Sequence, residues 1–220
     1  MQTVVITGAT GGIGFEFCRH YKEKGFHVVG ICRKATEALK ELGIAIIDDI
    51  DLTNDDAFSK VKNRLEGQVI DILINNAGLL ESNSLSKIDY ESLRRQFEIN
   101  TIAPLRMSEL LQDQIADGGK IALITSRMGS IADNTSGGSY GYRASKTALN
   151  MVGVSLAHDL SNRQIWVGLL HPGYVKTKMT GMTGHITPDV AVDGMLRIID
   201  QAKPDNTGFF WHSNGERLPW

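Results

Sequence analysis

Short apolar runs of strand length alternate with helical patterns along the chain, and this alternation limits the folds that it can adopt. Most of the runs are apolar throughout, as expected for strands that helices cover on both faces. In the helical stretch that includes Ala144, apolar residues recur at spacings of three and four. The alternation predicts an α/β fold with a parallel, doubly wound sheet. The expected strands are 3–7, 27–31, 44–48, 71–75, 120–125, 165–170 and 208–211.

Composition narrows the class of protein. The 220 residues suit a single domain spanning 1–220, and the hydrophobic fraction of 42% is enough for a buried core. A formal net charge of −2 argues against nucleic acid or an anionic membrane as a partner. The two cysteines, Cys18 and Cys32, form no metal-ligand cluster. Because no run reaches the roughly 18 apolar residues of a membrane span and no signal peptide is evident, we expect a soluble, cytoplasmic protein.

A glycine-rich turn, TGATGGIG over residues 7–14, directly follows the first expected strand. Gly8 permits a tight turn, Gly12 allows the backbone to approach a pyrophosphate, and Gly14 allows close packing of helix on sheet. The helix that begins at about Ile13 directs its free N–H groups and the positive end of its dipole towards the phosphates. The alternative is a strand–helix turn without a ligand. Its place after the first strand of a βαβ unit favours a nucleotide.

The end of the second expected strand selects between NAD and NADP. It carries Arg33 and Lys34 and no carboxylate that would bind the ribose 2′-hydroxyl of NAD. A guanidinium suits the 2′-phosphate of NADP, so the sequence favours NADP, with NAD as the alternative. Asp51 and Leu52, after the third strand, are candidates for contact with the adenine. The turn NNAG, at 75–78, is a candidate brace beside the cofactor.

Two tyrosines lie two residues apart in the segment SGGSYGYRASK, and one of them has a lysine partner. Lys146 follows Tyr142 by four residues, on the same face of a helix, whereas Ala144 occupies that position relative to Tyr140. A phenol with a pKa of about 10 is a poor base near neutral pH. The ammonium group should stabilise the phenolate and lower that pKa. Tyr142 is therefore the candidate general acid and base, against the alternative of two exposed residues on a first helical turn.

A second hydroxyl should polarise the substrate oxygen. Ser126 is best placed because it immediately follows the fifth expected strand. Ser130 lies four residues further on, and Ser136 and Ser139 are expected to be turn residues.

These segments together resemble the short-chain dehydrogenase/reductase family. The resemblance covers nearly the whole chain and includes TGATGGIG, DLT, NNAG, FEINTIAPL, YRASK and HPGYVKT in the family's order. The stretch SRMGSIADNTSGGSYGYRASKTALN and the ending GERLPW are similar to the C-factor-like branch, near the sniffer-type carbonyl reductases. The resemblance implies a single-domain Rossmann-like fold, with a seven-stranded parallel sheet flanked by helices, and hydride transfer with NAD or NADP.

The resemblance also implies roles for individual residues. Tyr142 serves as acid and base, Ser126 positions the substrate, Lys146 binds the nicotinamide ribose, and Asn100 holds a water in a proton relay. Without the resemblance, Asn100 is a polar residue that perturbs a helix interior, and His171 is a packing residue. The implied cofactor-binding residues are Gly8, Thr10, Gly12, Ile13, Gly14, Arg33, Asp51, Leu52, Asn75, Ala77, Gly78, Tyr142, Lys146, Pro172, Gly173, Val175 and Thr177.

Three features depart from the family's usual pattern. The spacing of 16 residues from Ser126 to Tyr142 is longer than usual, which predicts a bulging loop over the site. Nothing basic occupies Thr10 or Gly11, where many NADP-preferring members carry a charge. The substrate loop, about 177–188, is short and contains methionine and glycine, which predicts an open or adaptable pocket.

The sequence supports three functional hypotheses. The first is an NADP-preferring oxidoreductase that interconverts a small-molecule carbonyl and an alcohol. The second is a nucleotide-binding, C-factor-like signalling or sensing protein in which turnover is secondary. The third is an α/β domain that binds no nucleotide, which a thermal shift with NADP would test. Family habit predicts a homodimer or homotetramer that associates through the helices at about 88–116 and 141–161.

Overall fold

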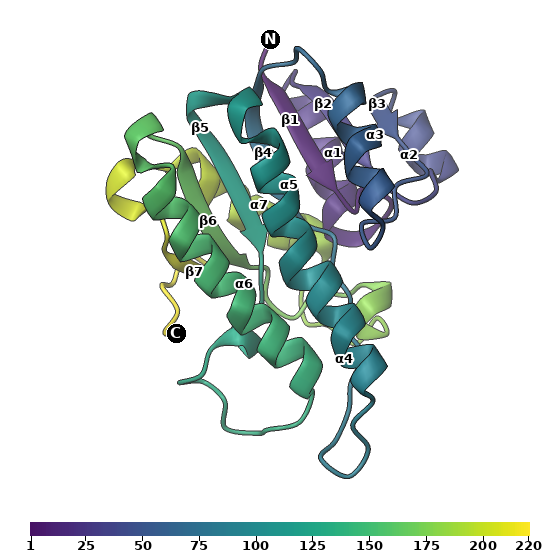
Figure 1. The fold of residues 1–220 in the computed structure, drawn as a ribbon, viewed down its shortest axis with the longest axis vertical. Coiled ribbons are helices and arrows are strands. Elements are labelled where there is room, and N and C mark those ends of the chain that lie inside the picture. The colour runs from purple at the N-terminus through teal and green to yellow at the C-terminus, as the bar shows by residue number, and fades with distance from the viewer.

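A parallel sheet of seven strands organises the computed structural model, which describes residues 1–220 (Figure 1). The strand order is β3-β2-β1-β4-β5-β6-β7, with every neighbouring pair parallel. This confirms the expected Rossmann-like, doubly wound α/β fold. The strands are β1 (Thr3–Thr7), β2 (His27–Ile31), β3 (Ala45–Ile47), β4 (Ile70–Asn75), β5 (Ile115–Ile124), β6 (Trp166–His171) and β7 (Phe210–His212).

Seven α-helices alternate with these strands. A π-helical turn, Glu98–Ile102, joins α4 to α5, so that together they form one long helical rod. The helices are α1 (Gly12–Glu23), α2 (Glu37–Glu41), α3 (Asp55–Arg64), α4 (Tyr90–Phe97), α5 (Ala103–Leu111), α6 (Tyr140–Asp159) and α7 (Pro188–Asp200).

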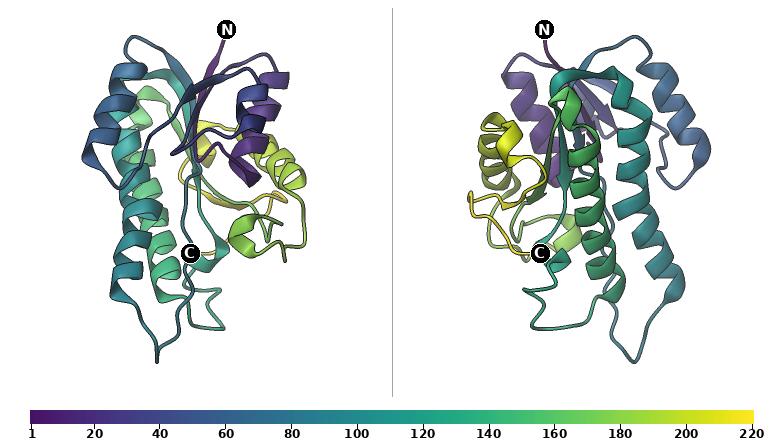
Figure 2. Two further views of the ribbon diagram at one scale, coloured as in Figure 1. Left: turned by 90° about the vertical axis from the view of Figure 1, so that its right-hand side faces the viewer. Right: turned by 60° about the vertical axis from the view of Figure 1, so that its left-hand side comes forward.

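Helices cover both faces of the sheet (Figure 2). Along β1, Val4 and Ile6 face the apolar core that contains Phe17 of α1 and Met195 of α7. Val5 faces the core on the opposite side of the sheet, which contains Met107 of α5. Because both faces of the strand are covered, every residue of β1 is buried. Two-sided burial is what selects continuous apolar runs over alternating ones in parallel sheets.

The fifth strand begins earlier than its apolar run indicates. It starts at Ile115, rather than at residue 120, because Ile115 pairs with Ile70 across a register shift that the polar segment after it conceals. No helix is long and apolar enough to cross a membrane. The carboxyl ends of β1, β4, β5 and β6 lie on one edge of the sheet, towards the lower part of Figure 1.

Candidate active site

The glycine turn after β1 is closely packed on two distant segments. Gly8 and Gly12 have φ angles of +69° and +50°, in the region that favours glycine. A Cβ atom at Gly8 would lie 2.9 Å from Cα of Ala77, and one at Gly12 would lie 3.0 Å from Cγ2 of Thr177. The structure therefore brings three parts of the expected cofactor site together, from the first, fourth and sixth strand ends.

Helix α1 starts at this turn without a side-chain cap. Its N-cap residue, Gly11, offers no side chain, so the first N–H groups of the helix lack a capping acceptor. Ile13 and Gly14 lie in this first turn, and Gly14 is buried against the carbonyl oxygen of Gly8. A helix start with free N–H groups after a strand is suited to a phosphate.

Thr7 and Asn76, which were not predicted as site residues, bind the glycine turn to the end of β4. The Nδ2 atom of Asn76 donates to the carbonyl oxygens of Thr7, at 3.0 Å, and Gly8, at 3.2 Å. The Thr7 hydroxyl accepts from the backbone N–H groups of Asn76 and Ala77, at 3.0 and 3.1 Å. Asn75, which was expected to bind cofactor, instead directs its side chain to Ser108 of α5, at 3.3 Å. The side chains of Asn75 and Asn76 therefore point in different directions, towards α5 and towards the glycine turn, and the NNAG motif alone does not predict which asparagine does which.

Arg33 and Lys34 are exposed just beyond the end of β2. Hydrogen bonds from the backbone and hydroxyl of Thr53 lower the pKa of Asp51, and the charge of Arg33 adds a smaller effect in the same direction. Leu52 is buried. Arg33 and Asp51 therefore lie close enough for the charge of one to act on the other.

Tyr142, Lys146 and Ser126 come together at the carboxyl end of β5. Tyr142 and Lys146 are buried on the first turns of α6, and the Lys146 ammonium lies 5.9 Å from the centre of the Tyr142 ring. Lys146 donates to the carbonyl oxygen of Ile124, at 2.8 Å. Ser126 caps a short turn by accepting from the N–H of Met128, at 3.2 Å, which fixes the hydroxyl beside the strand end.

The pKa of Tyr142 is raised, not lowered as the sequence analysis expected. Burial raises it, and a hydrogen bond with Ser126 acts in the opposite direction without offsetting the burial. Burial also lowers the pKa of Lys146 to about 7. The burial that raises the pKa of the phenol therefore also disfavours the charged form of its lysine partner.

Asn100 lies at the centre of the π-helical turn and is completely buried. Its Oδ1 atom accepts from the N–H of Leu79, and its Nδ2 atom donates to the carbonyl oxygen of Leu79, both at 2.8 Å. A Cβ atom at Gly78 would lie 3.4 Å from Oδ1 of Asn100 and 3.8 Å from Nζ of Lys146. The helix thus departs from α-helical geometry at Asn100, and Asn100 and Lys146 both lie near Gly78. π-turns of this kind occur frequently at functional sites.

The segment after β6 lies on the other side of the glycine turn. Pro172 and Val175 are buried, and Gly173 has a φ angle of +90° with His212 beneath it. Thr177 begins the short turn Lys178–Thr180 and reaches Gly12. Met179, which sequence reasoning did not select, places its methyl group near Gly78, so the short substrate loop reaches the lysine end of the site.

Two other serines of the loop before α6, Ser130 and Ser136, have structural partners. The Ser130 hydroxyl accepts from the N–H of Asp133, and the Ser136 hydroxyl accepts from Nη2 of Arg143. Ser139 has a left-handed backbone, and Tyr140 is partly exposed. The expected turn roles of these serines agree with the hydrogen bonds.

His171 packs edge to face on His212, with ring centres 4.9 Å apart. Burial, and then the nearby His212 and Arg127, lower the pKa of His171 to about 3. This is a neutral packing residue, as the sequence analysis expected. No group of three or more His, Cys, Asp or Glu side chains is arranged to hold a metal ion.

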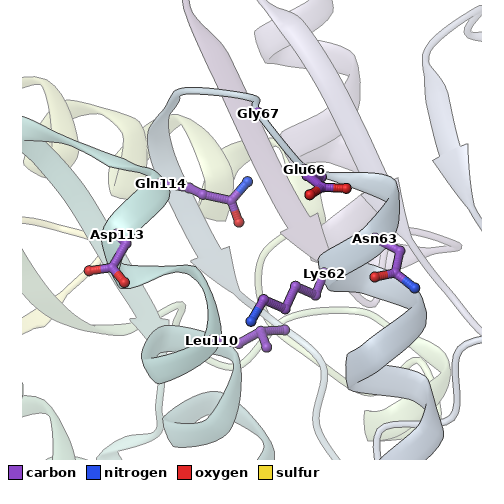
Figure 3. Close-up of a pocket in the computed structure, with 7 residues that line it drawn as sticks. All are labelled: Lys62, Asn63, Glu66, Gly67, Leu110, Asp113 and Gln114. Atoms are coloured by element: carbon purple, nitrogen blue, oxygen red, sulfur yellow. The ribbon is translucent and has the colours of Figure 1, made fainter.

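A shallow hollow of about 240 Å³ lies away from these groups (Figure 3). Gly67 and Gln114, which line it, precede the starts of β4 and β5, so the hollow lies at the opposite edge of the sheet. Leu110 is the one hydrophobic residue among the seven that line it. Ligands of open α/β sheets bind at the carboxyl edge, so we assign the site to the carboxyl edge and not to the hollow.

Comparisons with known proteins show the family of the chain. The family described as short chain dehydrogenase matches residues 2–185. A 1-hydroxy-2-glutathionyl-2-methyl-3-butene dehydrogenase of Rhodococcus sp. (strain AD45) is 38% identical, over 100% of both chains. The C-signal protein of Myxococcus xanthus is 42% identical, over 69% of this chain and 93% of its own.

Solved structures give the same result. The NADPH-bound carbonyl reductase from chicken fatty liver has a TM-score of 0.90 at 29% identity, covering 100% of this chain and 99% of its own. The carbonyl reductase Sniffer of D. melanogaster has a TM-score of 0.92 at 28% identity, with 100% of each chain covered. The family model over residues 2–185 and the relative that is 38% identical over the whole chain show that the chain belongs to the short-chain dehydrogenase/reductase family.

Proposed function

We propose that the protein is an NADP-preferring oxidoreductase that interconverts a carbonyl and an alcohol. The observation that carries the proposal is the buried pair of Tyr142 and Lys146, one helical turn apart, beside Ser126 at the end of β5. The similar carbonyl reductase from chicken fatty liver binds NADPH. The glycine turn suits a dinucleotide because it has no side chains at Gly8 and Gly12. A Cβ atom at these positions would meet Ala77 and Thr177, respectively.

The nicotinamide, when bound, supplies or accepts the hydride. The chain's own residues manage the oxygen and its proton. Ser126 donates a hydrogen bond to the substrate oxygen and fixes its position. Tyr142 gives its phenolic proton to that oxygen in reduction and accepts it in oxidation. Lys146 and Asn100, which both lie near Gly78, would provide polar groups on the path that restores the proton.

Arg33 would hold the 2′-phosphate of NADP, with Asp51 and Leu52 beside the adenine. Arg33 is exposed and not paired with a carboxylate in any ion pair of the structure. Its guanidinium is therefore free to form charge-assisted hydrogen bonds with a phosphate. This charge supports the preference for NADP over NAD.

The direct test is oxidation of NADPH in the presence of a panel of aldehydes, ketones and quinones. The Tyr142→Phe variant should bind NADPH normally, because the ring is retained, and should lose turnover by at least about a hundredfold, the lower range for removing a positioned acid. The Tyr140→Phe variant is the matched control and should retain activity. Near-normal turnover by Tyr142→Phe would rule out the assignment.

A signalling role is the second candidate, favoured by the 42% identity to C-signal. In that case binding of nucleotide would matter more than turnover. The buried Ser126, Tyr142, Lys146 and Asn100 argue for chemistry, because a sensor needs no proton-transfer groups. A protein that binds NADP with a clear thermal shift, yet turns over no carbonyl in the panel, would favour signalling.

We also propose a homo-oligomer that associates through α5 and α6, which lie on one face of the sheet (Figure 2). Exposed apolar side chains on this face include Ile102, Leu105 and Met151. Symmetric association is common among soluble proteins. Sedimentation velocity should show a dimer or tetramer, and Met151→Lys should shift it towards monomer.

A further inference from the structure

Two amide side chains, from Asn100 and Gln96, bind the backbone of the segment 79–83, and a third amide, from Asn83 within that segment, binds the start of α6. We call Asn100, Gln96 and Asn83 the amide clamp. Asn100 binds both backbone groups of Leu79, at 2.8 Å each. Gln96 does the same at Glu81, accepting from its N–H and donating to its carbonyl oxygen, both at 3.1 Å. Since Gln96 and Asn100 are four residues apart, they face the same side of the helical rod.

The third amide of the clamp extends from this segment to the catalytic helix. The carbonyl oxygen of Asn83 accepts from the N–H of Ser139, at 2.8 Å, and its Oδ1 atom accepts from the N–H of Tyr140, at 2.9 Å. Helix α6 has no side-chain cap of its own, because Ser139 adopts a left-handed backbone with a φ of +47°. Asn83 therefore supplies a hydrogen-bond acceptor for the free N–H of Tyr140 at the start of α6, from 57 residues away in the sequence.

The rod also contacts α6 directly around Tyr142. A Cβ atom at Gly141 would lie only 2.7 Å from Nε2 of Gln96, so the two helices approach closely there. Asn100 donates to the hydroxyl of Ser145 at 3.0 Å, and that hydroxyl donates to the carbonyl oxygen of Tyr142 at 2.9 Å. Gln96, Asn100 and Ser145 are completely buried, so these bonds do not compete with water.

We propose that Asn83 and Gln96 are positioning residues that hold the first turn of α6, so that the Tyr142 phenol stays beside Ser126 and Lys146. This inference rests on the proposed function, in which Tyr142 transfers the proton. Neither amide touches the reacting groups. Each acts on the backbone that carries them, where a displacement of about 1 Å can reduce the rate by up to a hundredfold.

The variants Asn83→Ala and Asn83→Asp separate this role from general stability. Asn83→Ala removes the acceptor for Tyr140 N–H, whereas Asn83→Asp keeps it and adds negative charge at a helix N-terminus. Nδ2 of Asn83 is buried without a partner, so the aspartate loses no hydrogen bond, and the positive end of the α6 dipole offsets the burial of its charge. Asp89→Ala is the matched control, since Asp89 caps α4 by accepting from the N–H groups of Glu91 and Ser92.

We expect Asn83→Ala to lower kcat/KM for the carbonyl about fivefold to tenfold, with the Kd for NADPH unchanged. Asn83→Asp should restore activity to within about twofold. Asp89→Ala should lose similar stability and keep wild-type kinetics. Wild-type kinetics in Asn83→Ala, failure of Asn83→Asp to restore activity, or an equal loss in Asp89→Ala would each overturn the proposal.

Amide hydrogen exchange provides a readout that does not depend on turnover. The N–H groups of Ser139 and Tyr140 should exchange at least about tenfold faster in Asn83→Ala and in Gln96→Met, but not in Asp89→Ala. If the wild-type protein reduced no carbonyl, the proposed function would fail, and exchange alone would decide whether the clamp holds α6. Unchanged protection at both amides would overturn the inference in either case.

Discussion

Replacing Gly14 with alanine should test whether the glycine turn is held by close packing. A Cβ atom there would lie 2.2 Å from the carbonyl oxygen of Gly8 and 2.5 Å from Nδ2 of Asn76. Both atoms belong to the brace between β1 and β4, so neither can move without breaking hydrogen bonds of the turn. Overpacking of this kind costs about 3 kcal/mol, the upper part of the usual range.

The substitution also brings a gain, since alanine is about 1 kcal/mol more favourable than glycine within a helix. The net change in the free energy of unfolding should therefore be a loss of about 2 kcal/mol. For a chain of this length, that corresponds to a fall in Tm of about 4–8 °C. Scanning calorimetry and urea denaturation at fixed protein concentration would measure it, and the Tm increase caused by NADP should shrink as well.

Gly11→Ala is the matched control. Gly11 is extended, with a φ of −176°, and no atom lies within 4 Å of its Cβ position. Its stability should change by less than about 1 kcal/mol, because the weaker N-cap and the lower entropy of the unfolded chain act in opposite directions. Equal stability of Gly14→Ala and Gly11→Ala would refute the packing argument.

Three further predictions concern the cofactor, the tyrosines and pH. Arg33→Ala should weaken NADP binding at least about tenfold while changing NAD little, because a charge-assisted pair to a phosphate is lost; fluorescence titration would show it, and equal weakening of both would contradict the 2′-phosphate role. The double variant Tyr140→Phe/Tyr142→Phe should be no less active than Tyr142→Phe alone, as judged by steady-state assay; a further loss would give Tyr140 a role. His171, whose pKa falls from 6.5 to about 3 on folding, should contribute stability that is fully present above about pH 6.5 and lost as pH falls towards 3. Its contribution should decline by about 1 kcal/mol per pH unit, and urea denaturation of His171→Phe should show a shallower acid limb than wild type.

Local spacing predicted the parts of the site that depend on neighbours in sequence. Tyr142 and Lys146 share a helix face because they are four residues apart, and Gly8, Gly12 and Gly14 lie within one turn. The sheet was predicted because two-sided burial leaves continuous apolar runs. The largest error in the strand bounds was the start of β5, because polar residues and glycines separate Ile115 from the rest of its strand.

The residues that were missed act over long distances in sequence and bind backbone atoms. Asn76 reaches the carbonyl oxygens of β1 from 68 and 69 residues away, and Asn83 reaches α6 from 57 residues away. Any residue can supply those backbone partners, so no pattern marks them. The predicted direction of the Tyr142 pKa shift was wrong for a related reason. Residue spacing reveals the lysine partner but not the burial of the phenol, which is the largest cause of the shift.

The position of β1 inside the sheet, between β2 and β4, has a consequence for how the chain folds. Its glycine turn is completed by Asn76 and Ala77 after β4, and by Thr177 after β6. These contacts are far apart in sequence, and such contacts form late and slowly. During synthesis, the first three strands therefore emerge without a finished nucleotide cradle. The dinucleotide should capture only chains that have assembled through the sixth strand, so its binding can serve as a probe of the last stages of folding.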